Sequence, residues 1–460
     1  MKRWVTVAVA VVALAWFGPS ARAAERKPNV IVFLVDDMGY ADVGAQGCRD
    51  IPTPNIDSLA SNGLRCTSGY VTAPVCSPSR GALMTGRYQQ RFGHEFNPRY
   101  PKRLADGYGL SLNETTIARY LKDAGYATGM FGKWHLGFQQ RFNPVNRGFD
   151  TFYGFLGGSH GYLPGSNQGQ EAEDPRSAMF RGTKPDELNE YTTDAFAREA
   201  ATFVGRHRGE PFFVYLPFNA VHTPLQAPHE YLRRFRDIRD PRRRQYAAMV
   251  SAVDDAVGTV MERIRREGLE QDTLVFFLSD NGGPTSNGSD NGPLRGHKAT
   301  TWEGGIRVPF LVQWKGHLPA GKLYDRPVAQ VDILPTALAA AGASVDPGWK
   351  LDGVNLLPFL GGSGKGDPHE ALYWRLGNQT AVRMGDWKLV RGRVGVARKG
   401  RFAVTEPQLF NVATDPGESR NLAAEQPDRV ERLRAAWERW NAELPPPAWR
   451  GPDAPRDPGA

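Results

Sequence analysis

The sequence lacks a long apolar segment after its first residues. Beyond residue 23, no stretch approaches the roughly 20 consecutive apolar residues that span a membrane, so we expect the mature protein to be soluble. The formal net charge of +8 is modest for 460 residues and favours anionic ligands only weakly. The arginine-rich stretch 233–244 has interleaved acidic residues and no accompanying aromatic platform, which argues against a nucleic-acid-binding protein.

Cysteine is scarce as well. The chain has three, Cys48, Cys66 and Cys76. If Cys76 has a chemical role, as the motif below indicates, a disulfide can form only between Cys48 and Cys66, and the sequence does not fix the distance between them. There is also no internal repeat and no long low-complexity tract before the C-terminal tail, which excludes a repeat architecture.

Residues 1–23 have the pattern of a cleaved secretory signal. Lys2 and Arg3 precede an apolar run from Trp4 to Phe17, and Ala21-Arg22-Ala23 supplies the small residues of a cleavage site. The apolar run is too short for a membrane span. We therefore expect an exported protein, periplasmic or secreted if it is bacterial, as the Arg-, Ala- and Gly-rich composition favours.

Short apolar runs that alternate with helical patterns predict an α/β fold. Its large sheet is expected to be mixed but mostly parallel, flanked by helices and buried on both faces. The predicted strands are Val30–Val35, Ala127–Phe131, Phe212–Leu216, Thr273–Leu278 and Pro309–Trp314. Apolar residues at helical spacing predict a helix with one face on this sheet; they are Met249, Val253, Val257, Val260 and Ile264.

The composition of the sequence changes near residue 360, where a glycine-rich linker at 361–366 begins. We assign residues 24–360 to a catalytic domain and 361–445 to a smaller subdomain of antiparallel sheet and helix. Its predicted strands are Ala371–Trp374, Thr380–Met384 and Trp387–Arg391, and its predicted helix carries Val430, Leu433, Trp437 and Trp440 on one face. The proline-rich residues 446–460 are predicted to be a disordered tail.

The most informative motif is Cys76-Ser77-Pro78-Ser79-Arg80, followed by Leu83-Met84-Thr85-Gly86-Arg87. Ser77 is expected to cap a helix, Pro78 to occupy its first position, and Gly86 to end it in a left-handed conformation. Cys76 would then lie just before a helix N-terminus. The helix dipole and Arg80 would favour negative charge on or near its side chain.

Two predicted strands deliver oxygen ligands at their carboxyl ends, where ligands bind in open parallel sheets. Val30–Val35 is followed by Asp36 and Asp37, and Thr273–Leu278 by Ser279 and then Asp280 and Asn281. An aspartate after a strand is often only a turn former. Two such pairs at equivalent strand ends, together with the cysteine motif, instead favour a site for Ca²⁺ or Mg²⁺.

The cysteine motif resembles the signature of type I sulfatases, a family within the alkaline-phosphatase-like superfamily that includes arylsulfatases and N-acetylgalactosamine-6-sulfatases. The resemblance covers roughly residues 27–445. It implies that Cys76 is oxidised to formylglycine by a formylglycine-generating or anaerobic sulfatase-maturing enzyme. It also implies one divalent ion, usually Ca²⁺, and its ligands match Asp36, Asp37, Asp280, Asn281 and the modified residue 76.

The resemblance further implies a set of catalytic residues. In the family mechanism, one hydroxyl of the hydrated aldehyde attacks the sulfur of a sulfate ester, and the second then expels sulfate. Arg80, Lys133 and Lys298 would offset negative charge. His135 would be the base for the elimination and His222 the donor to the leaving oxygen. Ser159 matches a family serine that contacts the hydrated aldehyde, although the spacing around it varies.

Other functions stay open at this stage. A buried structural cysteine or a plain thiol hydrolase would explain Cys76 alone, and a phosphatase or phosphodiesterase would share the fold but commonly needs a second metal ion. A non-catalytic glycan-binding relative would be expected to have lost part of the motif. We therefore predict a sulfatase acting on small sulfate esters or sulfated oligosaccharides. His94, Glu95, Asn97, His160 and the 282–296 segment are candidate pocket residues.

Overall fold

The structure is a computed structural model that describes residues 1, 4, 26–98, 107–166, 178–398 and 401–449. The predicted secretory signal, residues 1–23, therefore lies almost wholly outside the described residues. None of the helices in the described part of the chain is both long and apolar enough to cross a membrane.

Within the described residues, ten strands form the main sheet, in the order β11-β2-β10-β9-β1-β8-β4-β5-β6-β7. Its centre, β9 to β5, is parallel, and β10 runs antiparallel to both of its neighbours. The mixed, mostly parallel sheet is thus confirmed. The strands are β1 (Asn29–Val35), β2 (Leu64–Cys66), β4 (Ala127–Lys133), β5 (Thr151–Phe155), β6 (Met179–Arg181), β7 (Lys184–Asp186), β8 (Phe212–Pro217), β9 (Thr273–Ser279), β10 (Phe310–Gln313) and β11 (Lys322–Tyr324).

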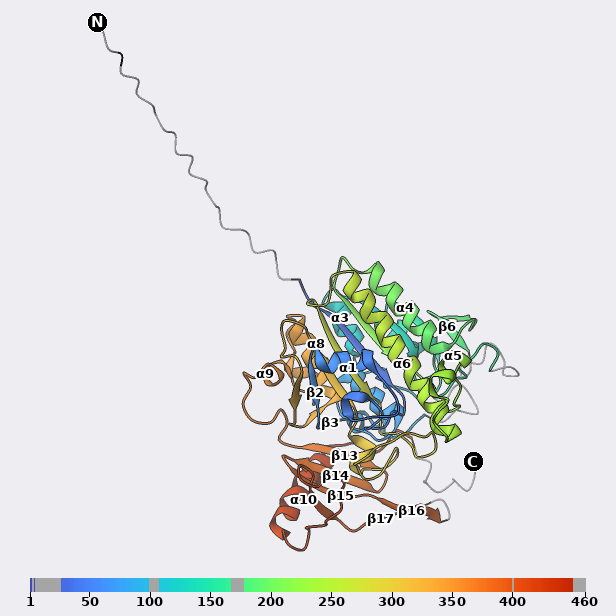
Figure 1. Ribbon diagram of the computed structural model, residues 1–460. Helices are drawn as coiled ribbons and strands as arrows, with labels where there is room; N and C mark the ends of the chain where they lie inside the picture. The colour runs from blue at the N-terminus through green and yellow to red at the C-terminus, as the bar shows by residue number, and fades with distance from the viewer. Residues whose placement is uncertain (2–3, 5–25, 99–106, 167–177, 399–400, 450–460) are drawn as a thin grey trace.

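Helices cover both faces of this sheet, and every residue of its central strand β1 is therefore buried. Side chains alternate across the strand: Ile31 and Phe33 join the core on one face, and Val30 and Val32 join the core on the other. The long helices α4 and α6 lie side by side over the first face (Figure 1). The helices are α1 (Pro54–Ser61), α2 (Cys76–Thr85), α3 (Ile117–Asp123), α4 (Thr192–Arg206), α5 (His229–Leu232), α6 (Pro241–Arg266), α7 (Glu303–Ile306), α8 (Ile333–Ala340), α9 (Leu357–Leu360) and α10 (Pro427–Ala442).

The predicted helix is α6, and its apolar stripe from Met249 to Ile264 is buried against the sheet, as expected. Asp240 caps it by accepting a hydrogen bond from the Arg242 N–H. Most of the arginine-rich stretch is exposed or half-buried at the start of this helix. Within this stretch, Arg234 forms an ion pair with Asp255, and Arg243 forms ion pairs with Asp42 and Asp50.

The two cysteines that could have paired lie on opposite faces of the sheet. Cys48 packs against the core on the α6 face, whereas Cys66 is buried in the core on the other face. Both are free thiols, so the structure contains no Cys48–Cys66 disulfide.

The C-terminal subdomain has the predicted strands and helix. An antiparallel sheet of β13 (Leu372–Leu376), β14 (Gln379–Met384), β15 (Trp387–Arg391) and β18 (Gln408–Asn411) lies below the main sheet in Figure 1. One face, with Trp374, packs on Tyr70 and Trp302 of the larger domain, and the other packs on α10. Two short pairs complete the strands: β3 (Gly69–Tyr70) with β12 (Val328–Ala329), and β16 (Arg393–Arg398) with β17 (Arg401–Val404).

The first residues of the tail that is predicted to be disordered, 446–460, contact the segment around His94. The Ala448 N–H donates to the Gly93 carbonyl, and the Trp449 indole donates to the Phe96 carbonyl. The Trp449 ring also meets His94 edge-on, with centroids 4.7 Å apart. Residues 450–460 lie outside the described residues.

Candidate active site

The site begins where β1 and β9 end side by side. These strands are parallel neighbours, with Val35 opposite Ser279, so the residues that follow them meet at one edge of the sheet. Asp36 and Asp37 come from β1, and Asp280 and Asn281 from β9; all four are buried. The Asp37 N–H donates to the Asp280 carboxylate across 3.3 Å, and Asp37 has a left-handed φ of 65°.

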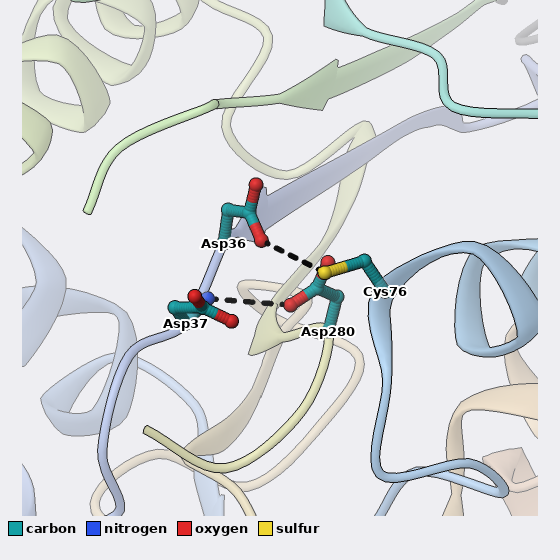
Figure 2. Close-up of side chains that lie close together, drawn as sticks. All are labelled: Asp36, Asp37, Cys76 and Asp280. Carbon is teal, nitrogen blue, oxygen red and sulfur yellow. Dashed lines mark hydrogen bonds between the residues drawn. The ribbon is translucent and has the colours of Figure 1, made fainter. Parts of the chain in front are cut away.

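Helix α2 brings Cys76 to these carboxylates (Figure 2). The thiol lies 3.5 Å from Asp36 Oδ1, and single ligand atoms of Asp36, Asp37, Cys76 and Asp280 all lie within 4.8 Å of one another. Gly86 ends the helix with a left-handed φ of 66°, as predicted. Burial raises the pKa of the Cys76 thiol to about 12, although the positive charges of Lys133 and Lys298 act in the opposite direction.

The predicted cap by Ser77 is wrong. Cys76 is itself the first helical residue, and Val75 occupies the capping position without a side-chain hydrogen bond. The Ser77 hydroxyl instead donates to the His135 carbonyl at 2.6 Å and lies 2.7 Å from His94 Nε2. Ser77 therefore ties the motif helix to the segment that follows β4, a role for which the sequence offered no local signal.

Three cations surround the carboxylates. Lys133 Nζ lies 2.5 Å from Asp36 Oδ2, and Lys298 Nζ lies 2.5 Å from Asp37 Oδ1 and 3.1 Å from Cys76 Sγ. Arg80 donates from Nε to Asp280 Oδ2 at 2.9 Å. All three cations predicted from the sequence are thus brought together at residue 76.

Burial and charge act in opposite directions on these groups. Burial alone would raise the pKa of Asp36, but the positive charges of Lys133, His222 and Arg80 outweigh it and lower that pKa. Burial and the neighbouring Asp36 carboxylate raise the pKa of Asp280. Burial opposes the charge of Lys298 too, yet Asp37 and the other acidic groups raise its pKa well above its ordinary value.

The two predicted histidines differ in exposure. Strand β4 ends at Lys133, and His135 follows with a left-handed φ of 59°. The alternation of side chains along a strand therefore does not determine the direction of the His135 side chain. Burial, with Lys133 and Arg80 nearby, lowers the pKa of His135 well below its ordinary value. The His222 side chain is 21% exposed, its Nε2 lies 3.7 Å from Asp37 Oδ2, and burial lowers its pKa.

The predicted pocket residues and Ser159 differ in burial and in their contacts. His94 and Glu95 are buried, and Glu95 forms an ion pair with Arg375. His160 is buried against Phe155. Asn97 is exposed and accepts the Ser77 N–H through its side-chain oxygen at 3.0 Å. Ser159 is exposed as well, next to Gly158, which closely approaches the His135 ring.

The donor set fits one divalent ion. Two oxygens that bind the same Ca²⁺ at about 2.3–2.6 Å each are at most about 5 Å apart, which agrees with the 4.8 Å spread of the ligand atoms. Asn281 Oδ1 is buried without a hydrogen-bond partner among the described residues, while its Nδ2 donates to Asp37 Oδ1 at 2.7 Å. A buried, unpaired amide oxygen beside three carboxylates is a ligand set for a hard cation.

Comparisons with known proteins extend over most of the chain. A family model described as Sulfatase matches residues 28–343. Arylsulfatase A of Bos taurus is 35% identical over 441 residues, which cover 87% of this chain and 84% of that protein. N-acetylgalactosamine-6-sulfatase of Homo sapiens is 31% identical over 478 residues, which cover 93% and 88%.

A solved structure is similar over the same extent. The crystal structure of Ps i-CgsB in complex with k-i-k-neocarrahexaose superposes with a TM-score of 0.85 at 38% sequence identity, covering 92% of this chain and 95% of that one. The shared region includes the C-terminal sheet as well as the main sheet, since it spans nearly the whole chain.

Proposed function

The chain belongs to the sulfatase family and is a sulfuric ester hydrolase, and on this premise we propose that it is an exported enzyme for sulfated carbohydrates. It would act through a formylglycine made from Cys76, with one divalent ion, Ca²⁺, at the strand ends. The observation that carries the proposal is the position of Cys76 Sγ, 3.5 Å from Asp36 and 3.1 Å from Lys298. A nucleophile at this atom would lie among ligands and cations.

A metal ion at this site would be held by Asp36, Asp37, Asp280, Asn281 and residue 76. When bound, it would supply positive charge that stabilises the nucleophile's oxygen and the sulfate. Asn281 supports this assignment because its buried Oδ1 has no partner within the described residues. Ca²⁺ is proposed over Mg²⁺ because the ligands are carboxylate and amide oxygens fixed by the protein, whereas Mg²⁺ usually keeps several waters.

The three cations would bind the sulfate. Lys298 reaches both the nucleophile position and Asp37, so it would neutralise charge between them. Arg80 is committed to Asp280 and to the Lys133 carbonyl, which orients it within the site. These fixed positive groups favour the single negative charge of a sulfate ester without a second metal ion.

The histidines would move protons. The lowered pKa of His135 keeps it neutral and able to accept a proton during the elimination that restores the aldehyde. The His222 Nδ1 lies 2.6 Å from the Thr223 carbonyl, which leaves Nε2 to face Asp37 and the leaving oxygen. With Nδ1 donating to the Thr223 carbonyl, His222 would donate from Nε2 as the imidazolium, a charge that Asp36 and Asp37 favour, and the proton would pass to the leaving oxygen as its bond to sulfur breaks.

Carbohydrate as the substrate class is supported by the neighbour solved with neocarrahexaose. Residues 1–23 support export, and maturation of Cys76 would require a formylglycine-generating or anaerobic sulfatase-maturing enzyme. The sugar, the sulfate position and the choice between endo and exo action are matters for a screen of defined sulfated mono- and oligosaccharides.

Paired substrates test this function. Matured enzyme should cleave an activated aryl sulfate much faster than the matching aryl phosphate, provided that the pocket admits the aryl group. His222→Ala should then slow the desulfation of sugars more than that of activated aryl esters, because only a poor leaving group depends strongly on protonation. A preference for phosphate would support the phosphatase alternative, and equal losses with both leaving groups would assign His222 to binding.

A further inference from the structure

Lys298 lies on a loop whose internal hydrogen bonds join His297 to Thr300 and to the Lys298 carbonyl. The loop runs from Gly296 to α7, and Ala299 within it adopts a left-handed φ of 65°, which is unfavourable for a residue with a Cβ. The Lys298 N–H bond to the Gly283 carbonyl is long, at 3.3 Å. Lysine is a flexible side chain, so the direction of its ammonium group depends on how well its backbone is held.

Gln379, at the start of β14 in the C-terminal sheet, holds this loop from the other side. Its Nε2 donates to the Ala299 carbonyl at 3.0 Å, and its Oε1 accepts the Thr301 N–H at 3.3 Å. The same oxygen accepts the Arg393 N–H at 3.1 Å. Gln379 is only 5% exposed, so these bonds are shielded from water.

The bond to Ala299 acts on a residue that is linked directly to the nucleophile's segment. The Ala299 N–H donates to the Pro74 carbonyl at 2.8 Å, two residues before Cys76. One residue, Ala299, therefore connects the C-terminal sheet with the entrance of α2, next to Lys298 in the chain. A shift of Ala299 would move the Lys298 Nζ relative to both of its partners, Asp37 Oδ1 and Cys76 Sγ.

We propose that Gln379 is a positioning residue that aims Lys298 at the nucleophile, so that the C-terminal subdomain takes part in the sulfatase reaction. Gln379 does not act on substrate. Its amide fixes the strained Ala299 conformation, which in turn keeps the Lys298 ammonium group between Asp37 and residue 76. The inference rests on the proposed role of Lys298.

The test is a double-mutant cycle on matured full-length enzyme. Gln379→Met keeps the side-chain volume and removes both hydrogen-bonding groups, and Gln379→Glu keeps the acceptor but removes the donor to Ala299. We expect each to lower kcat/KM for an activated aryl sulfate about tenfold, as the loss of one or two buried hydrogen bonds predicts, with the metal retained. In a Lys298→Ala background, Gln379→Met should change kcat/KM by less than about twofold, because there is no ammonium group left to aim.

Gln408→Met is the matched control, because Gln408 is a half-buried glutamine in β18 of the same sheet and is not bonded to the loop. It should leave kcat/KM unchanged. A tenfold loss of kcat/KM for Gln379→Met both in the natural enzyme and in Lys298→Ala would show a general structural role and overturn the proposal. No loss for Gln379→Met in the natural enzyme would overturn it as well. If Lys298→Ala alone is fully active, the role of Lys298 fails instead. If Gln379→Met does not fold, the same cycle with Gln379→Glu decides.

Discussion

Two of the clusters of buried charge in the described part of the chain can be compared, and we propose only one of them as a reaction site. The site cluster contains Asp36, Asp37, Asp280, Arg80, Lys133 and Lys298. The interface cluster contains Glu303, Arg307, Lys388 and Glu418, where α7 meets the C-terminal sheet. In each cluster, one carboxyl pKa is lowered by its cations, at Asp36 and Glu303, and one is raised by burial, at Asp280 and Glu418.

The clusters differ in whether their polar atoms are all paired with one another or are left able to bind a ligand. In the interface cluster, Lys388 Nζ lies 3.0 Å from Glu303 Oε1 and 2.9 Å from Glu418 Oε1, and all three side chains are fully buried. The site cluster has a third carboxylate, the Cys76 thiol and Asn281 Oδ1, which has no partner among the described residues, whereas Glu303 Oε1 and Glu418 Oε1 are ion-paired with Lys388. Burial and ion pairing alone therefore do not mark a site. A site is indicated by a position at the carboxyl ends of parallel strands together with a ligand atom that has no partner among the described residues.

The largest expected effect is at the nucleophile. Cys76→Ala should lower kcat/KM by more than about 10³-fold, because residue 76 forms the covalent intermediate of the proposed mechanism, and thermal unfolding should shift little. Cys66→Ala is the control, since Cys66 is an equally buried thiol remote from the site cluster. It should keep full activity per folded chain. Substantial turnover by the Cys76 variant would remove residue 76 from the mechanism.

The second largest expected effect is on metal binding, which should depend on the site cluster and not on the interface cluster. Asp280→Asn should weaken metal binding by about 10–100-fold or more, because the site loses an anchoring charge, and kcat/KM should fall with it. Glu418→Gln removes a carboxylate of the interface cluster and should leave the metal content at one ion per chain. Elemental analysis and calorimetric titration with Ca²⁺ measure both. Two zinc ions per chain in the natural enzyme would point to phosphatase chemistry.

Breaking the interface cluster should cost stability instead. Lys388→Met leaves Glu303 and Glu418 buried without their shared cation, and the loss of one partner of a buried pair typically costs about 3–5 kcal/mol. Chemical denaturation should show this loss in the free energy of unfolding, while the folded fraction keeps its metal. If Lys388→Met loses metal without losing stability, the division between the clusters is wrong.

The sequence predicts the site cluster better than the interface cluster for a physical reason. Asp36 directly follows an apolar run and Asp280 follows another after Ser279. Parallel pairing brings those strand ends together, so local patterns locate both residues. Glu303 and Glu418 are 115 residues apart, and no local pattern links them or Gln379 to Lys298. The role of Ser77 was missed because an extended Val75 takes the capping position, which depends on how the chain enters α2.

The smallest expected effect concerns pH. Burial lowers the pKa of His94, beside Ser77, from 6.5 to about 3. Between these values the unfolded chain binds a proton that the folded chain excludes, so stability falls as the pH decreases through this window. His94→Gln should reduce the slope of unfolding free energy against pH by up to about 1.4 kcal/mol per pH unit. The exposed His229→Gln is the control, and an unchanged slope in the His94 variant would contradict the assignment.

Mass spectrometry of residue 76 tests the central claim most directly. Cleavage after Arg65 and Arg80 releases one peptide, residues 66–80, that contains both Cys66 and Cys76. In an active preparation, alkylation should modify Cys66 as a thiol, whereas residue 76 should carry an aldehyde, in a fraction that rises in proportion to sulfatase activity. Full activity in a preparation with both residues alkylated as thiols would contradict a formylglycine nucleophile.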